Sequence, residues 1–317
     1  MMAAPTLAPA GVGALAGIGN TPLVELARIV PRGSARVIAK LEFANPTGSM
    51  KDRMAVAVVM AAESDGRLAP GGTVVEYTAG TTGVSLAFVC AARGHHLHAV
   101  SSDAFSQEKL RTMRAFGAEI TIVPSDNRRI TAALIKEMIE TARGLGVRPG
   151  HWWCDQLNNH DAIAGYHALG EELWVQSGQR VDALVHSVGT AHSIHGAASA
   201  LRRHQPRLTV HAVEPAESAV LSGLPSGSHK IEGIGIGFTP PLWQPEEVNE
   251  VLTVSTADAK AMARRLARDE GVFAGTSSGA NVVAALRIAE RLGPGATVAT
   301  IICDSGLRYL STDVFAD

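Results

Sequence analysis

Short runs rich in Val, Ile, Leu and Thr alternate with longer runs of helical periodicity along most of the chain. The predicted strands are Val37–Leu41, Thr73–Tyr77, Leu97–Val100, Glu119–Val123, Asp182–His186, Leu208–Val213 and Thr297–Ile302. The predicted helices are Met54–Ala62, Thr82–Arg93, Gln107–Phe116, Ile130–Arg143, Ala191–Arg203, Ala257–Glu270 and Ser278–Leu292. Such alternation is typical of parallel sheets with right-handed crossovers. The pattern predicts an α/β fold made of two α/β layers that face each other.

The length of the chain favours two domains with a ligand cleft between them, because 317 residues exceed the usual size of a single core. The Gly- and Pro-containing stretch 144–151 is the predicted boundary region, which gives an N-terminal domain of residues 1–149 and a C-terminal domain of residues 150–317. Residues 1–18 have no basic segment followed by a continuous apolar run, so we expect a short, loosely attached leader and not a signal peptide.

The composition is that of an ordinary soluble globular protein. Hydrophobic residues make up 46% and charged residues 18%, with a formal net charge of -2, so neither nucleic acid nor a membrane is an expected partner. No stretch reaches the ~18 apolar residues of a membrane span. Cys90, Cys154 and Cys303 are widely spaced and form neither a metal-ligand nor a disulfide pattern. We expect buried, reduced thiols in a cytoplasmic protein, and no metal site.

One lysine, Lys51, stands out among the polar residues. It follows a turn of residues 45–50 that contains Pro and Gly, and it precedes the apolar helical run Met54–Ala62. Near the positive end of a helix dipole and beside Arg53, its amine is expected to have a lowered pKa and more of the nucleophilic free base, although Asp52 acts in the opposite direction. This placement suits a Schiff base, whereas a lone lysine after a glycine turn is more often a solvated helix-start residue.

Three loops at predicted strand ends or helix starts are rich in Gly, Ser and Thr: Thr78–Gly83, Ser187–Ser193 and Gly275–Ala280. Ligands of parallel sheets bind beyond the carboxyl ends of strands, where helix N-termini favour anions. The first loop suits a carboxylate, and its alternative is ordinary N-capping by Thr81 or Thr82. The third loop has the same alternative, a helix cap.

The second loop suits a phosphate dianion. It combines the backbone amides of a glycine turn with the hydroxyls of Thr190 and Ser193. It lacks the glycine pattern of a dinucleotide fingerprint and the Gly-Lys pair of a nucleotide-binding phosphate loop. A protonated His192 would help to neutralise the phosphate, but a partly exposed loop histidine is the commoner outcome.

Taken in order, these segments resemble the fold-type II pyridoxal-phosphate enzymes of the cysteine synthase and cystathionine β-synthase family. The resemblance spans Gly19 to Asp317, from the opening motif of residues 19–24 to a C-terminal signature of residues 304–312. It implies a two-domain fold with a mainly parallel sheet in each domain, early residues that pack on the other domain, pyridoxal 5′-phosphate as cofactor, a small amino acid as substrate, and a homodimer.

The resemblance also implies a role for each motif. Lys51 corresponds to the Schiff-base lysine and general base, and Ser277 to the serine that bonds the pyridine nitrogen. The implied phosphate cradle consists of Gly189, Thr190, Ala191, His192 and Ser193. The implied substrate site consists of Thr78, Ala79, Gly80, Thr81, Thr82, Gln156 and Gly233, and Thr81 also stands where the family bonds the cofactor ring. The loop of residues 232–235 corresponds to the segment that helps to close the cleft.

Two departures from the family pattern affect this expectation. Thr81 replaces an asparagine, which leaves a shorter side chain with one donor beside the cofactor ring. Ala191 and His192 replace two glycines in the phosphate cradle. Because side chains restrict positive φ, either the turn is of another type or the phosphate sits differently.

The neutral hydroxyl of Ser277 argues for prompt loss of a β-substituent and against transamination, since it cannot hold a proton on the ring as a carboxylate would. The leading hypothesis is therefore β-replacement on O-acetylserine, another O-activated serine, serine or cysteine, with sulfide giving L-cysteine. The alternatives are β-elimination by a cysteine desulfhydrase or a serine/threonine dehydratase, a catalytically silent regulatory homologue, and a nucleotide-binding α/β protein.

Overall fold

The structure is a computed structural model that describes residues 13–316 except 128 and 130. Most of the predicted leader lies outside the described residues, as does the predicted first residue of the helix Ile130–Arg143. The described part of the leader contains a short 3-10 helix, η1 (Ala14–Gly17).

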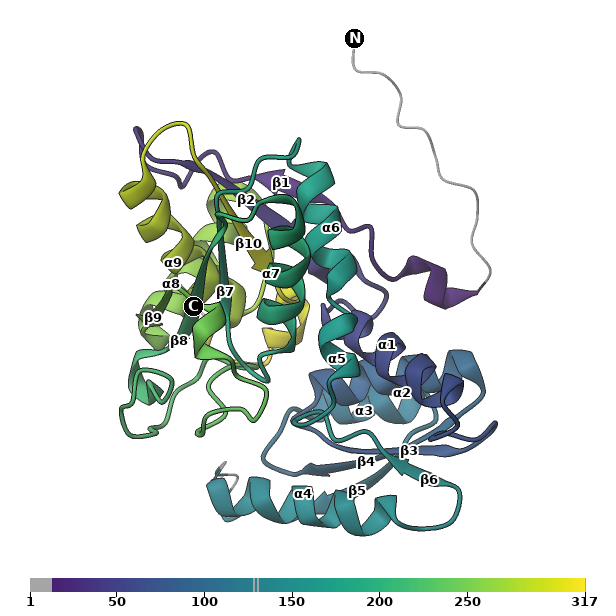
Figure 1. The fold of residues 1–317 in the computed structure, drawn as a ribbon. Coiled ribbons are helices and arrows are strands. Elements are labelled where there is room, and N and C mark those ends of the chain that lie inside the picture. The colour runs from purple at the N-terminus through teal and green to yellow at the C-terminus, as the bar shows by residue number, and fades with distance from the viewer. Residues whose placement is uncertain (1–12, 128, 130, 317) are drawn as a thin grey trace.

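The larger of two units is built on a six-stranded sheet. Its strand order is β1 (Leu23–Glu25), β2 (Arg36–Leu41), β10 (Thr297–Ile302), β7 (Ala183–Ser187), β8 (Thr209–Pro215) and β9 (Glu250–Val254). β1 pairs antiparallel with β2, and the other neighbours pair in parallel. Figure 1 shows the helices on its two faces: α6 (His167–Gln176), α7 (His192–His204), α8 (Thr256–Arg265) and α9 (Thr276–Leu292).

Alternation along β10 explains this two-sided packing. Ala299 and Ile301 belong to the same apolar cluster as α7, whereas Val298 and Ile302 belong to the cluster formed with α9. Because successive side chains of a strand point to opposite faces, the apolar residues of this strand serve both layers, and the buried Thr300 in its middle is satisfied by donating to Val185 O at 2.9 Å.

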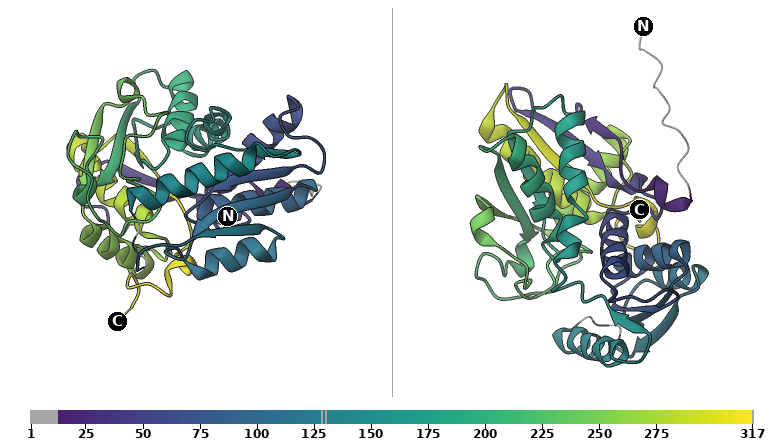
Figure 2. Two further views of the ribbon diagram at one scale, coloured as in Figure 1. Left: turned by 90° about the horizontal axis from the view of Figure 1, so that it is seen from below. Right: turned by 45° about the vertical axis from the view of Figure 1, so that its right-hand side comes forward.

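The smaller unit has a four-stranded parallel sheet in the order β5 (Glu119–Val123), β4 (His96–Ser102), β3 (Thr73–Tyr77) and β6 (His151–Trp153). One face carries α1 (Lys51–Ser64), α2 (Thr81–Arg93) and α3 (Gln107–Ala115), and the other carries α4 (Ala132–Gly146) (Figure 1). The short helix α5 (Asp161–Ala164) contacts both α1 and α7. Figure 2 shows the two units from two further directions.

The predicted α/β fold with two mainly parallel sheets is confirmed. The sequence pattern missed β1, β6, β9, α5 and α6, and it merged α8 with the π-helical turn η5 (Leu266–Glu270). Strands of three residues contain too few positions to reveal a period of two. Residues 151–153 pair with β3 in the smaller sheet, a few residues beyond the predicted boundary at 149/150. The early strands β1 and β2 lie in the larger sheet, in keeping with the expectation that early residues pack on the other domain.

A buried ion network fixes the start of α1 to the larger unit. Arg53 Nε donates to Glu42 Oε2 at 2.7 Å, and Arg53 Nη1 donates to Glu172 Oε1 at 2.7 Å. Lys40 Nζ lies 2.7 Å from Glu172 Oε2. Two acids balance two bases, so each buried charge has a partner. Arg53 follows Lys51 by two residues, and the network therefore attaches the first turn of α1 to β2 and α6.

The described part of the chain contains no helix with the length and apolar character that crossing a bilayer requires. Cys90, Cys154 and Cys303 are all buried free thiols within that part, as predicted.

Acid should weaken the ion network through Glu172. Burial alone raises the pKa of Glu172, but hydrogen bonds and charge from Arg53 and Lys40 outweigh burial and lower the pKa from 4.5 to about 2. A carboxylate with a lowered folded pKa stabilises the fold above its unfolded pKa, and this contribution is lost as the pH falls from about 4.5 toward 2. We expect Glu172→Gln to lower the free energy of unfolding at pH 7 by about 1–2 kcal/mol, and the difference from wild type to shrink between pH 5 and pH 2 in urea titrations.

The neighbouring Glu171→Gln variant is a matched control. Glu171 pairs with Arg203 and His204 on the exposed side of α6. Its loss should change the free energy of unfolding by less than about 0.5 kcal/mol. Equal losses in both variants would contradict the special role of the buried network.

Candidate active site

The loop that carries Lys51 is fixed to the carboxyl end of β10. Met50 N–H donates to Cys303 O at 2.9 Å, and Ser305 N–H donates to Gly48 O at 3.0 Å. Gly48 has a φ of 77°, a left-handed conformation that glycine adopts without strain. These contacts place Lys51, the first residue of α1, at the sheet edge where β10 ends.

The amine of Lys51 has the lowered pKa that the sequence predicts, but the main cause is different. Burial lowers the pKa to about 8, and the nearby Cys303 thiol acts in the opposite direction. The expected contributor Arg53 is paired with Glu42 and Glu172. About a tenth of such amines are uncharged at pH 7, compared with less than about a thousandth of ordinary lysines. Lys51 as a whole residue is half-buried.

The loop between β3 and α2 is organised by Thr78. Its Oγ1 accepts the N–H groups of Gly80 at 2.9 Å and Gly83 at 3.0 Å. The helix begins at Thr81, directly after the cap residue Gly80, so the alternative of capping by Thr81 or Thr82 is wrong. The hydroxyls at 81 and 82 are therefore free of a capping role.

Gln156 lies against this first loop. Thr82 Oγ1 donates to Gln156 Oε1 at 3.0 Å, and Gln156 Nε2 donates to Tyr77 O at 2.9 Å. Glu76 accepts from the backbone N–H and the side-chain amide of Gln156. Burial raises the pKa of Glu76 to about 8, so this carboxyl group is mostly protonated at pH 7. The sequence pointed to Gln156 but not to Glu76, whose only signal is one acidic residue inside an apolar strand.

The loop between β7 and α7 retains a glycine-like turn. Ala191 has a φ of 69°, in the left-handed region, which costs a residue with a Cβ about 1–2 kcal/mol. The sequence left open a turn of another type at this point. The structure instead keeps the positive φ of a glycine turn. A Cβ at Gly189 would lie 2.4 Å from Gly233 O, so this loop and the Gly233 loop are in direct contact.

His192 is buried, contrary to the expected partly exposed histidine. It is the first residue of α7, is 1% exposed, and has its Nδ1 3.0 Å from Thr190 Oγ1. Burial, followed by the charge of Lys51, lowers the pKa of His192 to about 3. The ring is therefore neutral at pH 7 in the absence of a ligand, and in that state it adds no positive charge to the loop. Among the described residues its Nε2 has no partner.

A second histidine, His186, contacts the same loop between β7 and α7. His186 Nε2 lies 2.8 Å from Ser193 Oγ, and Asn281 Nδ2 lies 3.2 Å from His186 Nδ1. Asn281 Oδ1 also accepts from Ser187 N–H at 2.7 Å, which ties α9 to the loop. Neither His186 nor Asn281 was singled out from the sequence, because the contact joins segments about a hundred residues apart.

The loop before α9 brings Ser277 to the same edge. The Ser277 hydroxyl interacts with the thiol of Cys303, whose pKa is raised by burial to about 12. Ser278 Oγ accepts from Cys303 N–H at 2.9 Å, and Thr276 Oγ1 accepts from Glu232 N–H at 3.2 Å. These hydroxyls bind other segments, so the alternative of a simple helix cap does not describe this loop.

Arg308 links the first loop to the loop before α1. Its Nη1 donates to Thr81 Oγ1 at 3.3 Å, and its Nη2 donates to Thr47 O. Thr81 therefore accepts from Arg308 and keeps its own O–H for another acceptor.

The loops before α1, α7 and α9 converge at the carboxyl edge of the larger sheet. The charge of Lys51 lowers the pKa of both His186 and His192, which places the amine within electrostatic reach of the second loop. Within the described part of the chain, Ser187 Oγ and Asp304 Oδ1 are, like His192 Nε2, buried without a partner. Buried polar atoms are normally satisfied, so this edge is built for a polar ligand. A nucleophilic amine, a helix N-terminus and a nearby hydroxyl fit a phosphorylated aldehyde.

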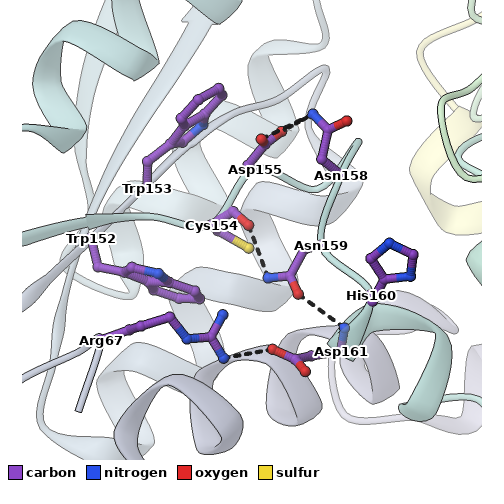
Figure 3. A pocket seen from close by; sticks show the side chains of 9 residues that line it. All are labelled: Arg67, Trp152, Trp153, Cys154, Asp155, Asn158, Asn159, His160 and Asp161. Atoms are coloured by element: carbon purple, nitrogen blue, oxygen red, sulfur yellow. Dashed lines mark hydrogen bonds and ion pairs between the residues drawn. The ribbon is translucent and has the colours of Figure 1, made fainter. Parts of the chain in front are cut away.

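A cavity of about 440 Å³ lies elsewhere, beside β6 and α5. Figure 3 shows the residues that line it: Arg67, Trp152, Trp153, Cys154, Asp155, Asn158, Asn159, His160 and Asp161. Arg67 lies over the Trp152 ring and pairs with Asp161 at 2.7 Å. None of the predicted site residues lines this cavity.

Comparison with known proteins agrees with the geometry. The chain is 39% identical over 302 residues to the cysteine synthase of Staphylococcus aureus strain N315, which covers 94% of this chain and 95% of that protein. Its structure is similar to that of a cysteine synthase from Entamoeba histolytica, with a TM-score of 0.91, 34% identity, and coverage of 99% and 94% of the two chains.

A hydrogen sulfide-producing enzyme from Fusobacterium nucleatum is also similar, with a TM-score of 0.88, 31% identity, and coverage of 95% and 100% of the two chains. Residues 14–304 match the family described as pyridoxal-phosphate dependent enzymes. With a reactive lysine at the edge of a parallel sheet and similarity along almost its whole length, the chain belongs to the pyridoxal-phosphate-dependent enzyme family.

Proposed function

We propose that this protein catalyses a cysteine synthase-like β-replacement, in which sulfide takes the place of the β-substituent of O-acetyl-L-serine or another O-activated serine to give L-cysteine. The observation that carries the proposal is the Lys51 amine, with a pKa of about 8, at the edge where three loops converge. The similarity to cysteine synthases over 94% of the chain supports β-replacement as the reaction.

Pyridoxal 5′-phosphate fits the residues around Lys51. The loop Gly189–Ser193 would hold its phosphate through backbone N–H groups and hydroxyls, Ser277 its pyridine nitrogen, and Thr81 the ring. When bound, the cofactor supplies the electron sink for charge that develops at the substrate Cα. The hydroxyl of Ser277 is neutral and holds no ring proton, which favours loss of a β-substituent over transamination.

The first loop would hold the substrate carboxylate. The residues proposed for this site are Thr78, Ala79, Gly80, Thr81, Thr82 and Gln156, with Gly233 on the facing side. Thr78 holds the shape of the turn by accepting from Gly80 and Gly83, and Glu76 and Tyr77 hold the side-chain amide of Gln156, so the site is shaped before the ligand arrives. The Thr81 O–H is the side-chain donor that stays available to it. Lys51 then removes the α-proton as general base, which its lowered pKa permits near neutral pH.

β-Elimination is the second candidate. The similarity to a hydrogen sulfide-producing enzyme at 31% identity favours the release of sulfide from cysteine as a side reaction or a main one. Which reaction dominates depends on how well the contact between Gly189 and the Gly233 loop excludes water. A homodimer, drawn from the family resemblance, and a cytoplasmic location, drawn from the widely spaced cysteines, also remain predictions.

The reaction itself is tested by product analysis of the cofactor-loaded protein. O-acetyl-L-serine with sulfide should give L-cysteine and acetate, faster than L-cysteine alone gives sulfide and pyruvate. Thiol derivatisation with mass spectrometry measures cysteine, and lactate dehydrogenase coupling measures pyruvate. Pyruvate without cysteine formation would contradict β-replacement and support β-elimination.

The lowered pKa of Lys51 predicts how pH controls cofactor capture. A lysine with a pKa of about 8 should capture pyridoxal phosphate with a rate that rises roughly tenfold from pH 6 to pH 7 and levels off above pH 8. Stopped-flow absorbance on cofactor-free protein measures this rate, and Lys51→Arg should show no capture. A rate that continues to rise to pH 10 would mean that the Lys51 amine has an ordinary pKa.

The strained turn at Ala191 predicts a stabilising substitution. Ala191→Gly relieves the left-handed strain but adds backbone entropy to the unfolded chain, which leaves a net gain of about 0.5–1 kcal/mol in the free energy of unfolding. Urea titration measures it. Ala197→Gly in the interior of α7 is the control and should have the opposite sign, with a loss of about 1 kcal/mol or more. Destabilisation by Ala191→Gly would contradict the turn geometry.

A further inference from the structure

A half-buried ion pair joins the two units beside the proposed substrate site. Lys109, in α3 of the smaller unit, lies with its Nζ 2.6 Å from Glu232 Oε2, in the loop of the larger unit that precedes Gly233. The Lys109 side chain is 7% exposed and that of Glu232 is 43% exposed. The same ammonium lies 5.7 Å from the centre of the Tyr309 ring. A buried ammonium without its carboxylate would be costly, so the pair constrains both partners.

The stem of Lys109 covers the first loop. Gly80 has a φ of 134°, and a Cβ at this position would lie 2.4 Å from Lys109 Cδ. The glycine is therefore needed for the lysine stem to lie on the turn. Any outward movement of Lys109 would remove the support of the backbone amides that the turn presents.

Glu232, the partner of Lys109, contacts the proposed cofactor loops of the larger unit. Its backbone N–H donates to Thr276 Oγ1 at 3.2 Å, one residue before Ser277. The following residue, Gly233, has its carbonyl oxygen against Gly189. The segment of Glu232 and Gly233 therefore connects Lys109, through the Glu232 carboxylate, to both loops proposed for the cofactor, through its backbone.

We propose that Lys109 and Glu232 are positioning residues for the amino-acid substrate, which hold the Gly80 turn against the Gly233 loop across the cleft. The proposal rests on the proposed function, because the turn is the proposed carboxylate site. The ion pair keeps the donors for the substrate carboxylate, in the smaller unit, close to Lys51 and the loops proposed for the cofactor. Both groups can then contact the same ligand. Loss of the pair weakens substrate binding more than it slows the chemical step.

Steady-state kinetics of four variants tests the pair. Lys109→Met keeps the stem on Gly80 and removes the charge, and Glu232→Gln keeps the shape and removes the charge. Each should raise the KM for O-acetyl-L-serine by about tenfold and change kcat by less than about threefold. The double variant should cost no more than either single one, since the shared contact is already lost. Lys109→Arg, which keeps a cation, should restore most of the affinity.

Lys260→Met is the matched control. Lys260 Nζ lies 2.6 Å from Asp313 Oδ1, with side chains 12% and 57% exposed, in a pair between α8 and the C-terminal segment. Its loss should leave the KM unchanged. The proposal would be overturned if Lys109→Met and Glu232→Gln left the KM unchanged, if their effects added, or if Lys260→Met raised the KM equally.

Amide hydrogen exchange tests the pair without turnover. In cofactor-loaded protein, residues 229–237 and 78–83 should exchange faster in Lys109→Met and Glu232→Gln than in wild type, and at the wild-type rate in Lys260→Met. Equal exchange in all four proteins would overturn the proposal. Failure of wild-type protein to convert O-acetyl-L-serine would instead overturn the proposed function, and the exchange result would still decide whether the ion pair holds the two loops.

Discussion

The position of Lys51 depends on the buried network of Arg53, Glu42, Glu172 and Lys40. Arg53 belongs to the first turn of α1, whose helix packs in the smaller unit, while its partners lie on or beside the larger sheet. The helix that begins with Lys51 is therefore held by charge at one end and by apolar packing along its length. Breaking one partner would leave buried charges unpaired, which makes the arrangement hard to distort.

Burial then gives the site its protonation states. It lowers the pKa of Lys51 to about 8 and the pKa values of His186 and His192 to about 3, so the surroundings of the amine are neutral at pH 7. It raises the pKa of Glu76 to about 8, so the carboxyl group that contacts Gln156 is mostly protonated at pH 7. The same low polarity that increases the free-base fraction of the lysine also removes competing charges from its neighbourhood. A bound anion would consequently rely on backbone amides and hydroxyls.

The periodic segments and the glycine-rich loops could be predicted from the sequence, because strand and helix periods and turn residues are local properties. The contacts that give these loops their geometry could not. Asn281 and His186, or Lys109 and Glu232, are more than ninety residues apart, and only the fold brings them together. The buried state of His192 was also missed, since a histidine after a glycine turn gives no local sign of what covers it.

A single amine, that of Lys51, is proposed to carry the cofactor. Borohydride reduction of the cofactor-loaded protein, followed by proteolysis and mass spectrometry, tests it most directly. We expect one pyridoxyl-phosphate adduct per chain, on the peptide that contains Lys51. An adduct on a different lysine, or none at saturating cofactor, would contradict the claim.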